Sequence, residues 1–196
     1  RAGPVILAAL QTGQIGYAGA AVLLRAVYYF ASLGGAGFAF FAVLFGSRQD
    51  ALDAARLCRW ALGAVLLGLL AALGSLTIQV GVLTGGETLL DADVWQMVLT
   101  SRAAASYGLG VAGLLLVALL AFGPRGRVPA AIGGVLVCAS YPLLGHTTML
   151  APRLLVAGLL LVHLLVAAFW IGSLLPLAWS APSGSCSAPE STSETF

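Results

Sequence analysis

Residues 154–179 read LLVAGLLLVHLLVAAFWIGSLLPLAW and contain no Asp, Glu, Lys or Arg. The hydrocarbon core of a bilayer is about 30 Å thick, so a helix of roughly 20 apolar residues can cross it. The segment therefore predicts a membrane-spanning helix. Four other stretches meet or approach the same criterion, at about residues 21–45, 60–83, 103–122 and 128–144. The chain is thus predicted to be all-α, an integral membrane helical bundle with about five transmembrane helices.

The composition supports lipid as the main solvent. Hydrophobic residues make up 60% of the 196 residues and charged residues only 8%, whereas soluble domains carry about 25% charged residues. That deficit is too large for an ordinary water-exposed surface, so the lipid bilayer is the expected partner. The net charge of +2 is small and does not favour a nucleic-acid partner.

Three regions follow from the pattern along the chain. Residues 1–20 are predicted to be an N-terminal extension or interfacial segment, because the run 4–10 is too short to span and Gln11 and Gln14 follow it. Residues 21–179 form the transmembrane domain. Residues 180–196 are rich in Ser, Pro and Thr, so we expect a disordered polar tail, although the abrupt change also fits a truncated end.

The arginines predict the orientation. The links between the first and second and between the third and fourth predicted helices carry five arginines: Arg48, Arg56, Arg59, Arg125 and Arg127. The other two links carry only Arg102 and Arg153. Short cytoplasmic loops are enriched in positive residues. We therefore predict a multi-pass protein of the plasma membrane with the N-terminus outside and the end of the fifth helix in the cytoplasm.

The chain has two histidines and two methionines. His146 follows the fourth predicted helix, and Met149 stands three residues later. His163 lies ten residues past Arg153, about 15 Å into the membrane, where an ionisable side chain usually faces the bundle interior. Imidazole and thioether groups suit copper, so all three are candidate ligands. Two plainer alternatives stay open: His163 only hydrogen-bonds a neighbouring backbone, or His146 is an ordinary loop residue.

Two further side chains stand out in the predicted spans. Trp170 follows His163 by seven residues and so shares its helix face, either as a packing residue or as part of a site. Arg25 lies near the outer end of the first helix. It either extends its charge to the interface or orients a carboxylate of the second long link, such as Glu87 or Asp91.

Several enzyme classes find no support in the sequence. It has no phosphate-binding Walker loop, no HExxH zinc motif and no GxSxG nucleophile motif. No paired carboxylates lie inside a predicted span, and the three cysteines are too far apart for a CxxC site. We predict that the chain is not an enzyme.

Three segments together resemble a known family. They are GHTTM at residues 145–149, LVHLL at 161–165 and FWIGSLLPL at 169–177. This pattern is similar to the copper resistance protein D (CopD/PcoD) family. The run LRAVYY at 24–29 also resembles the first helix of that family, with Tyr28 where an aromatic residue or His follows the Arg. The resemblance spans about residues 22–179.

This resemblance implies a multi-helix protein of the bacterial inner membrane that serves copper homeostasis. It implies copper transport (uptake) or copper resistance, with a periplasmic CopC-like copper-binding protein as partner. Carried over by position, His146 and His163 become the copper ligands. Met149 is added on the chemistry of sulfur alone.

Two alternatives remain. In a haem-b electron-transfer protein, two histidines from neighbouring helices would clamp one iron, although the predicted depths of His146 and His163 differ by roughly 10–15 Å. In a structural or assembly subunit, no metal would bind at all.

Overall fold

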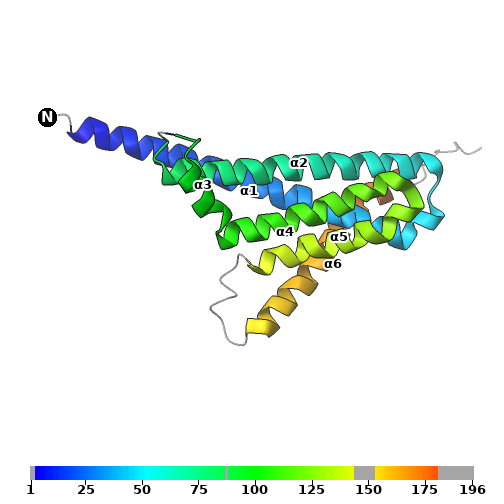
Figure 1. Cartoon of the computed structure of the whole chain (residues 1–196). Coiled ribbons are helices and arrows are strands. Elements are labelled where there is room, and N and C mark those ends of the chain that lie inside the picture. The colour runs from blue at the N-terminus through cyan, green and yellow to red at the C-terminus, as the bar shows by residue number, and fades with distance from the viewer. Residues whose placement is uncertain (1–2, 87, 144–152, 181–196) are drawn as a thin grey trace, which may run out of the picture.

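The computed structural model describes residues 3–86, 88–143 and 153–180. Regular structure in these residues is helical throughout, which confirms the predicted all-α class (Figure 1). The helices are α1 Gly3–Phe45, α2 Ala51–Leu83, α3 Ala92–Leu99, α4 Arg102–Val117, α5 Arg127–Ser140 and α6 Arg153–Ser180, with short 3₁₀ segments at Gly46–Arg48, Ala118–Gly126 and Tyr141–Leu143.

Four continuous stretches are long and apolar enough to cross a membrane: Ala18–Arg48, Ala51–Leu83, Arg102–Leu143 and Leu154–Trp179. The third holds two helices, because the chain reverses near Gly123, whose backbone has φ 66° and ψ −138°. As a result α4 and α5 run side by side in opposite directions (Figure 1). The five long helices of the bundle are therefore those that hydropathy predicts.

Element boundaries differ from the hydropathy pattern at two places. Helix α2 begins at Ala51, about nine residues before the predicted start. Charged residues lower the hydropathy there without breaking the helix, and Arg56 pairs with Asp53 at 3.5 Å one turn away. Helix α1 is continuous from Gly3, so the predicted extension of residues 1–20 runs into the first span without a turn.

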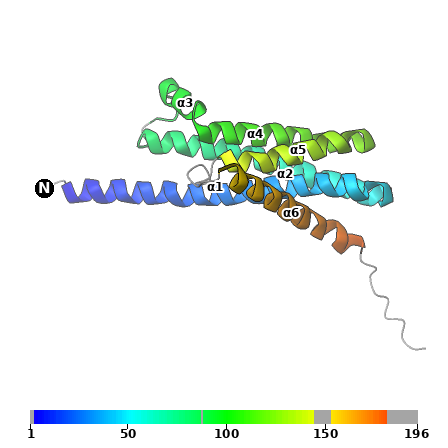
Figure 2. The same cartoon turned by 90° about the horizontal axis from the view of Figure 1, so that it is seen from below.

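Helix α3 is absent from the predicted elements because it is short and only partly apolar. The Asp91 carboxylate accepts hydrogen bonds from the backbone N–H groups of Asp93 and Val94 at 3.0 and 3.3 Å. This is an ordinary N-terminal cap. It places a short helix in the link between α2 and α4, at one end of the bundle (Figures 1 and 2).

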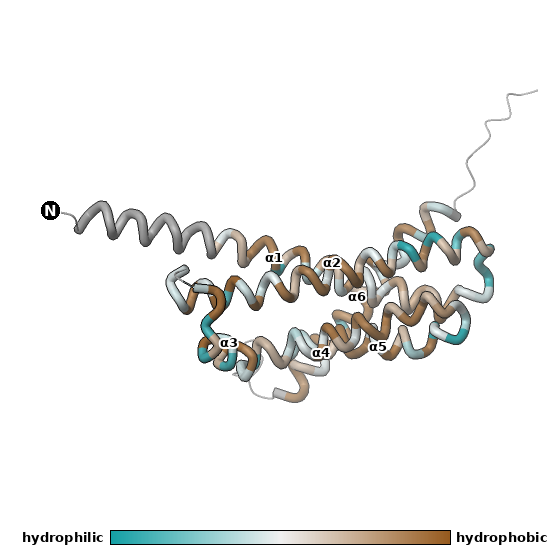
Figure 3. Tube along the Cα trace, turned by 45° about the horizontal axis from the view of Figure 1, so that its top comes forward, coloured by the Kyte–Doolittle hydropathy of each residue, from teal (hydrophilic) through white to brown (hydrophobic). Residues whose placement is uncertain are grey.

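The arginine-rich links lie together at the other end of the bundle. The Arg127 guanidinium donates to the carbonyl of Gly46 at 2.8 Å, so the α1–α2 and α4–α5 links are neighbours. The rings of Trp60 and Trp179, 6.4 Å apart, bring the end of α6 there as well. Hydrophilic residues gather at the two ends, whereas the helices between them are mainly hydrophobic (Figure 3). The chain alternates between two ends as predicted, and which end is cytoplasmic stays a prediction.

Glycines set the closest helix contacts. A Cβ on Gly37 of α1 would lie 2.8 Å from the Cα of Gly172 on α6. A Cβ on Gly113 of α4 would lie 2.6 Å from the carbonyl oxygen of Gly133 on α5. Both crossings leave no room for a side chain, as is typical of membrane helices that pack through small residues. Helix α1 thereby sits at the centre, in contact with α2, α4, α5 and α6.

Candidate functional site

The bundle interior contains a tyrosine–serine cluster. It joins α1, α4 and the end of α5, in the half of the bundle nearer to α3. We use this name for six residues: Tyr28, Ser32, Ser106, Tyr107, Ser140 and Tyr141. All but Tyr141 are buried, and Tyr141 is partly buried.

Hydrogen bonds connect the cluster between helices. Ser32 Oγ lies 2.5 Å from the carbonyl oxygen of Tyr28 and 2.5 Å from the hydroxyl of Tyr141. Since Ser32 has one proton and donates it to the carbonyl, the Tyr141 hydroxyl is the donor of the second bond. On the other side, Ser106 Oγ donates to the carbonyl of Ser140 at 2.7 Å and so ties α4 to α5.

Aromatic contacts complete the cluster. The rings of Tyr28 and Tyr107 are 5.0 Å apart and meet edge to face, as do those of Tyr29 and Tyr141. The Tyr28 hydroxyl packs on Gly110 beside Ser140, and a Cβ at Gly110 would collide with it. The cluster offers neutral hydroxyl oxygens, whereas copper prefers imidazole and sulfur. Its arrangement holds three helices together and does not form a copper site.

His163 does not face this interior. It lies on α6 and is exposed in the structure, contrary to the expectation drawn from its depth. It precedes Gly172 by nine residues, about two and a half helical turns, so the two residues point in opposite directions. Since Gly172 packs on α1, the imidazole is on the outer side of the bundle.

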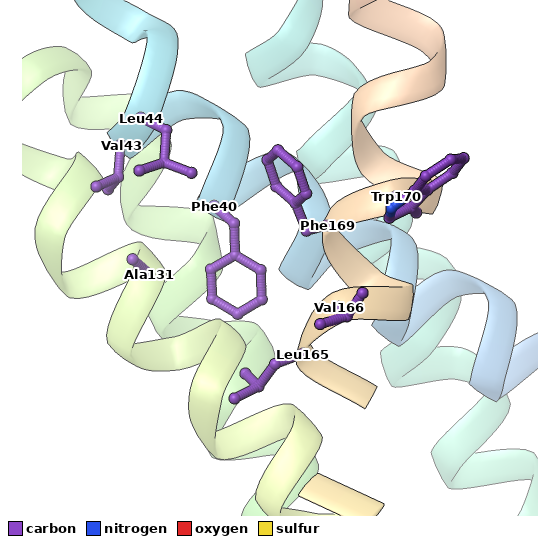
Figure 4. A pocket seen from close by; sticks show the side chains of 8 residues that line it. All are labelled: Phe40, Val43, Leu44, Ala131, Leu165, Val166, Phe169 and Trp170. Atoms are coloured by element: carbon purple, nitrogen blue, oxygen red, sulfur yellow. The ribbon is translucent and has the colours of Figure 1, made fainter. Parts of the chain in front are cut away.

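Trp170 shares that outer side, as its seven-residue spacing predicts. Its side chain is 66% exposed, so it does not pack in the bundle core. It borders an apolar groove of about 380 Å³ between α1, α5 and α6, lined also by Phe40, Leu165 and Phe169 (Figure 4). The groove is lined by apolar side chains, none of which could bind a metal ion.

Arg25 is exposed on α1 and makes no ion pair within the part of the chain that the structure describes. Asp91 uses its carboxylate to cap α3, and Glu87 lies outside the described residues. The idea that Arg25 orients a carboxylate therefore stays a prediction.

His146 and Met149 also lie outside the described residues, so the structure does not place them beside His163. In the ranges 3–86, 88–143 and 153–180, no three His, Cys, Asp or Glu side chains gather as a metal site. The ligand set predicted from sequence, His146, Met149 and His163, remains a prediction.

The sequence comparison identifies the family. The description "Copper resistance protein D-like, N-terminal domain" matches residues 15–151. The chain belongs to this family. The match covers α2, α4, α5 and most of α1, and it includes the GHTTM segment with His146 and Met149. It ends before α6, so the resemblance drawn from residues 161–177 lies beyond it. Searches of curated proteins and of solved structures found no match.

This copper resistance protein D-like chain is a multi-pass membrane protein of a copper-handling family. The tyrosine–serine cluster is not among the sites predicted from the sequence. A signal was present, because Tyr28 and Ser32 are one turn apart, and Ser106 and Ser140 are polar residues within otherwise apolar spans. Polar groups at membrane depth usually bond to a neighbouring helix.

Proposed function

We propose that this chain moves copper, as its cargo, across the bacterial inner membrane. The observation that carries the proposal is the family match over residues 15–151 on a bundle of membrane-spanning helices. Copper uptake is the direction implied by the resemblance, and a periplasmic CopC-like protein would deliver the ion. The role is transport and not catalysis, since the sequence supplies no catalytic motif.

The proposed route begins at the outer face with His146 and Met149 and continues to His163. Imidazole and thioether ligands suit cuprous copper, and few ligands per site would allow the ion to leave again. The exposed position of His163 supports a route along the outer side of α6. The tyrosine–serine cluster fills the interior with hydroxyls and aromatic rings, which are poor partners for copper.

The proposed orientation places the arginine-rich end in the cytoplasm and the α3 end outside. The hydrogen bond from Arg127 to Gly46 supports it, since the links predicted to be cytoplasmic share one end. His146 then lies in the link on the outer side, where copper would arrive.

The test is cuprous copper binding by the purified chain in detergent, measured by metal analysis together with an absorption spectrum. We expect copper in the wild type and at least a severalfold loss in His146→Ala and in His163→Ala. Leu154→Ala is the control, because Leu154 is 89% exposed and lies on the opposite side of α6 from His163. Cells that express the same variants would report copper accumulation.

Unchanged copper accumulation in the His163→Ala cells would contradict the proposal. A Soret band in the purified chain would instead favour the haem-b alternative. Within the described residues His163 is the one histidine, and it faces away from the bundle, so nothing there supports a haem clamped between two helices.

A further inference from the structure

The apolar groove between α1, α5 and α6 is a hollow built by three helices. Phe40 of α1 lies at its base and packs on α5, since a Cβ at Gly134 would lie 2.9 Å from the Phe40 ring. Leu165 and Phe169 of α6 line the other side (Figure 4). Its volume of about 380 Å³ lies in the range of small-ligand pockets. A flat helix face meets many lipid chains in passing, whereas this hollow can hold one chain in place.

Two arginines lie beyond one end of the groove, at the arginine-rich end of the bundle. Arg127 precedes Ala131, a lining residue, by four positions on α5, so the two share a helix face. Arg48 follows the lining residue Leu44 by four positions, through the short 3₁₀ segment. The Arg127 guanidinium donates to the carbonyl of Gly46 at 2.8 Å. This bond places it beside the segment that carries Arg48, so both cations belong to the same end of the groove.

No carboxylate in the described part of the chain pairs with either cation. The salt bridge printed by the fold at this end joins Arg56 to Asp53 on α2 at 3.5 Å, and Asp50 pairs with neither Arg48 nor Arg127. Arg48 is exposed and Arg127 is half-buried. A guanidinium has five N–H donors, and Arg127 uses one of them on the backbone of α1. The remaining donors suit a phosphate, which arginine binds with two parallel hydrogen bonds.

An apolar groove that ends at two unpaired cations matches one class of membrane molecule. A phospholipid carries acyl chains below a phosphate, in the same order as the groove and its arginines. Basic pockets between transmembrane helices bind anionic headgroups in this way. The bilayer surrounds the groove with acyl chains, and the two positive charges select the lipids whose headgroup has a net negative charge.

We propose that this groove binds one acyl chain of an anionic phospholipid whose phosphate is held by Arg48 and Arg127. The proposal does not depend on the copper function. Helix α6 packs mainly on α1, through Gly37 and Gly172, so a chain in the groove adds contact between α6 and α5. A lipid that binds only the folded bundle also stabilises it by mass action.

Native mass spectrometry of the full chain in detergent tests the headgroup. Phosphatidylglycerol and phosphatidylcholine with identical acyl chains are offered in equal amounts, and the wild type should retain phosphatidylglycerol severalfold more often. One arginine near an anionic headgroup is worth about a fivefold change in binding, so Arg127→Gln should lower this preference by about that factor. Arg48→Gln should do the same without breaking a hydrogen bond of the fold, which keeps the test decisive if Arg127→Gln unfolds.

Arg59→Gln is the matched control. Arg59 is exposed at the same end of the bundle, but on α2, which does not line the groove, so its loss should leave the preference unchanged. Equal retention of the two lipids by the wild type would overturn the proposal. An equal loss of preference in Arg59→Gln and Arg48→Gln would also overturn it, because the arginines would then act as a general surface charge.

Ala131→Leu tests the acyl chain. The larger side chain fills part of the groove and should lower the retention of both lipids severalfold. Ala55→Leu adds the same atoms on an exposed position of α2 and should have no effect. An excess of glycerol phosphate, the headgroup without chains, should not displace the lipid. Displacement by glycerol phosphate, or full retention of phosphatidylglycerol in Ala131→Leu, would mean that the cations act without the groove and would refute the site.

Discussion

Ser32 and Tyr141 form a hydrogen bond that joins two helices inside the bundle. The bond links α1 to the end of α5 at 2.5 Å, and Ser32 keeps its second bond to the carbonyl of Tyr28. Bonds of this kind between membrane helices contribute about 0.6 kcal/mol on average, because the unfolded chain in lipid also finds partners. At the scale of residues, such contacts adjust the packing and do not determine the fold.

We expect Tyr141→Phe to lower the free energy of unfolding in detergent by about 0.6 kcal/mol, since only the bond to Ser32 is lost. Tyr29→Phe is the matched control. The Tyr29 ring packs on that of Tyr141, but its hydroxyl makes no hydrogen bond with the described residues. Equal stability of the two variants, measured by denaturant titration, would show that the bond contributes nothing.

A methyl group at Gly37 should disturb the crossing of α1 and α6. Its Cβ would collide with the carbonyl of Ala168 and lie 2.8 Å from Gly172, so Gly37→Ala should destabilise the chain by about 1–3 kcal/mol. Gly34→Ala, one turn earlier, meets no heavy atom within 4 Å and should be neutral or slightly stabilising. Thermal unfolding of both variants in detergent compares them, and a Gly37→Ala variant as stable as Gly34→Ala would disprove the close crossing.

At the scale of elements, glycines determine the shape of the hairpin formed by α4 and α5. Its two helices contact at Gly113 and Gly133, and the reversal between them depends on the backbone of Gly123. With φ 66° and ψ −138°, that residue occupies a conformation that side-chain-bearing residues rarely adopt. Arg125 and Arg127, two of the five arginines that predict the orientation, also lie at this turn.

Gly123→Ala should therefore lower the free energy of unfolding by about 1–3 kcal/mol. Backbone strain is the only cause, because a Cβ at this position meets no heavy atom within 4 Å. Gly108→Ala in α4 has equal space but a helical backbone, and it should not destabilise. Denaturant unfolding of the two variants measures the difference. A neutral Gly123→Ala would mean that the turn adopts another conformation.

At the scale of the whole molecule, the links separate into two ends. Arg127, bonded to Gly46, marks one end, and α3 marks the other. The polar residues at both ends and the apolar helices between them (Figure 3) are what a bilayer requires. Arginine enrichment at one end gives the whole molecule its expected direction in the membrane.

Thiol labelling of intact cells would check that direction. In the chain without native cysteines, Thr88→Cys should react with a membrane-impermeant reagent added outside. Ser47→Cys should react only after the cells are permeabilised, because it lies in the arginine-rich link. The reverse pattern would place the N-terminus in the cytoplasm and move the proposed copper entry to the other side.

The sequence by itself determined the solvent, the helical class and the five long helices. In lipid every backbone polar group must bond within its own segment, so apolar stretches of about 20 residues become helices whatever they pack against. The segments GHTTM, LVHLL and FWIGSLLPL together indicated the family, and the family match over residues 15–151 confirms it. Helix α3 and the first turns of α2 do not follow from hydropathy, because polar residues lower the mean hydropathy of both segments.

Only the tertiary structure decided which faces meet. Helix α6 is apolar all round, so its sequence carries no periodic signal for the side that is covered. The close contact between Gly37 of α1 and Gly172 of α6 determines which side is covered. His163 and Trp170 therefore lie on the outer side of α6. The tyrosine–serine cluster likewise arises from residues on three helices far apart in the sequence, brought together by packing. Lipid makes each helix form by itself, but contact between helices depends on shape, which hydropathy does not encode.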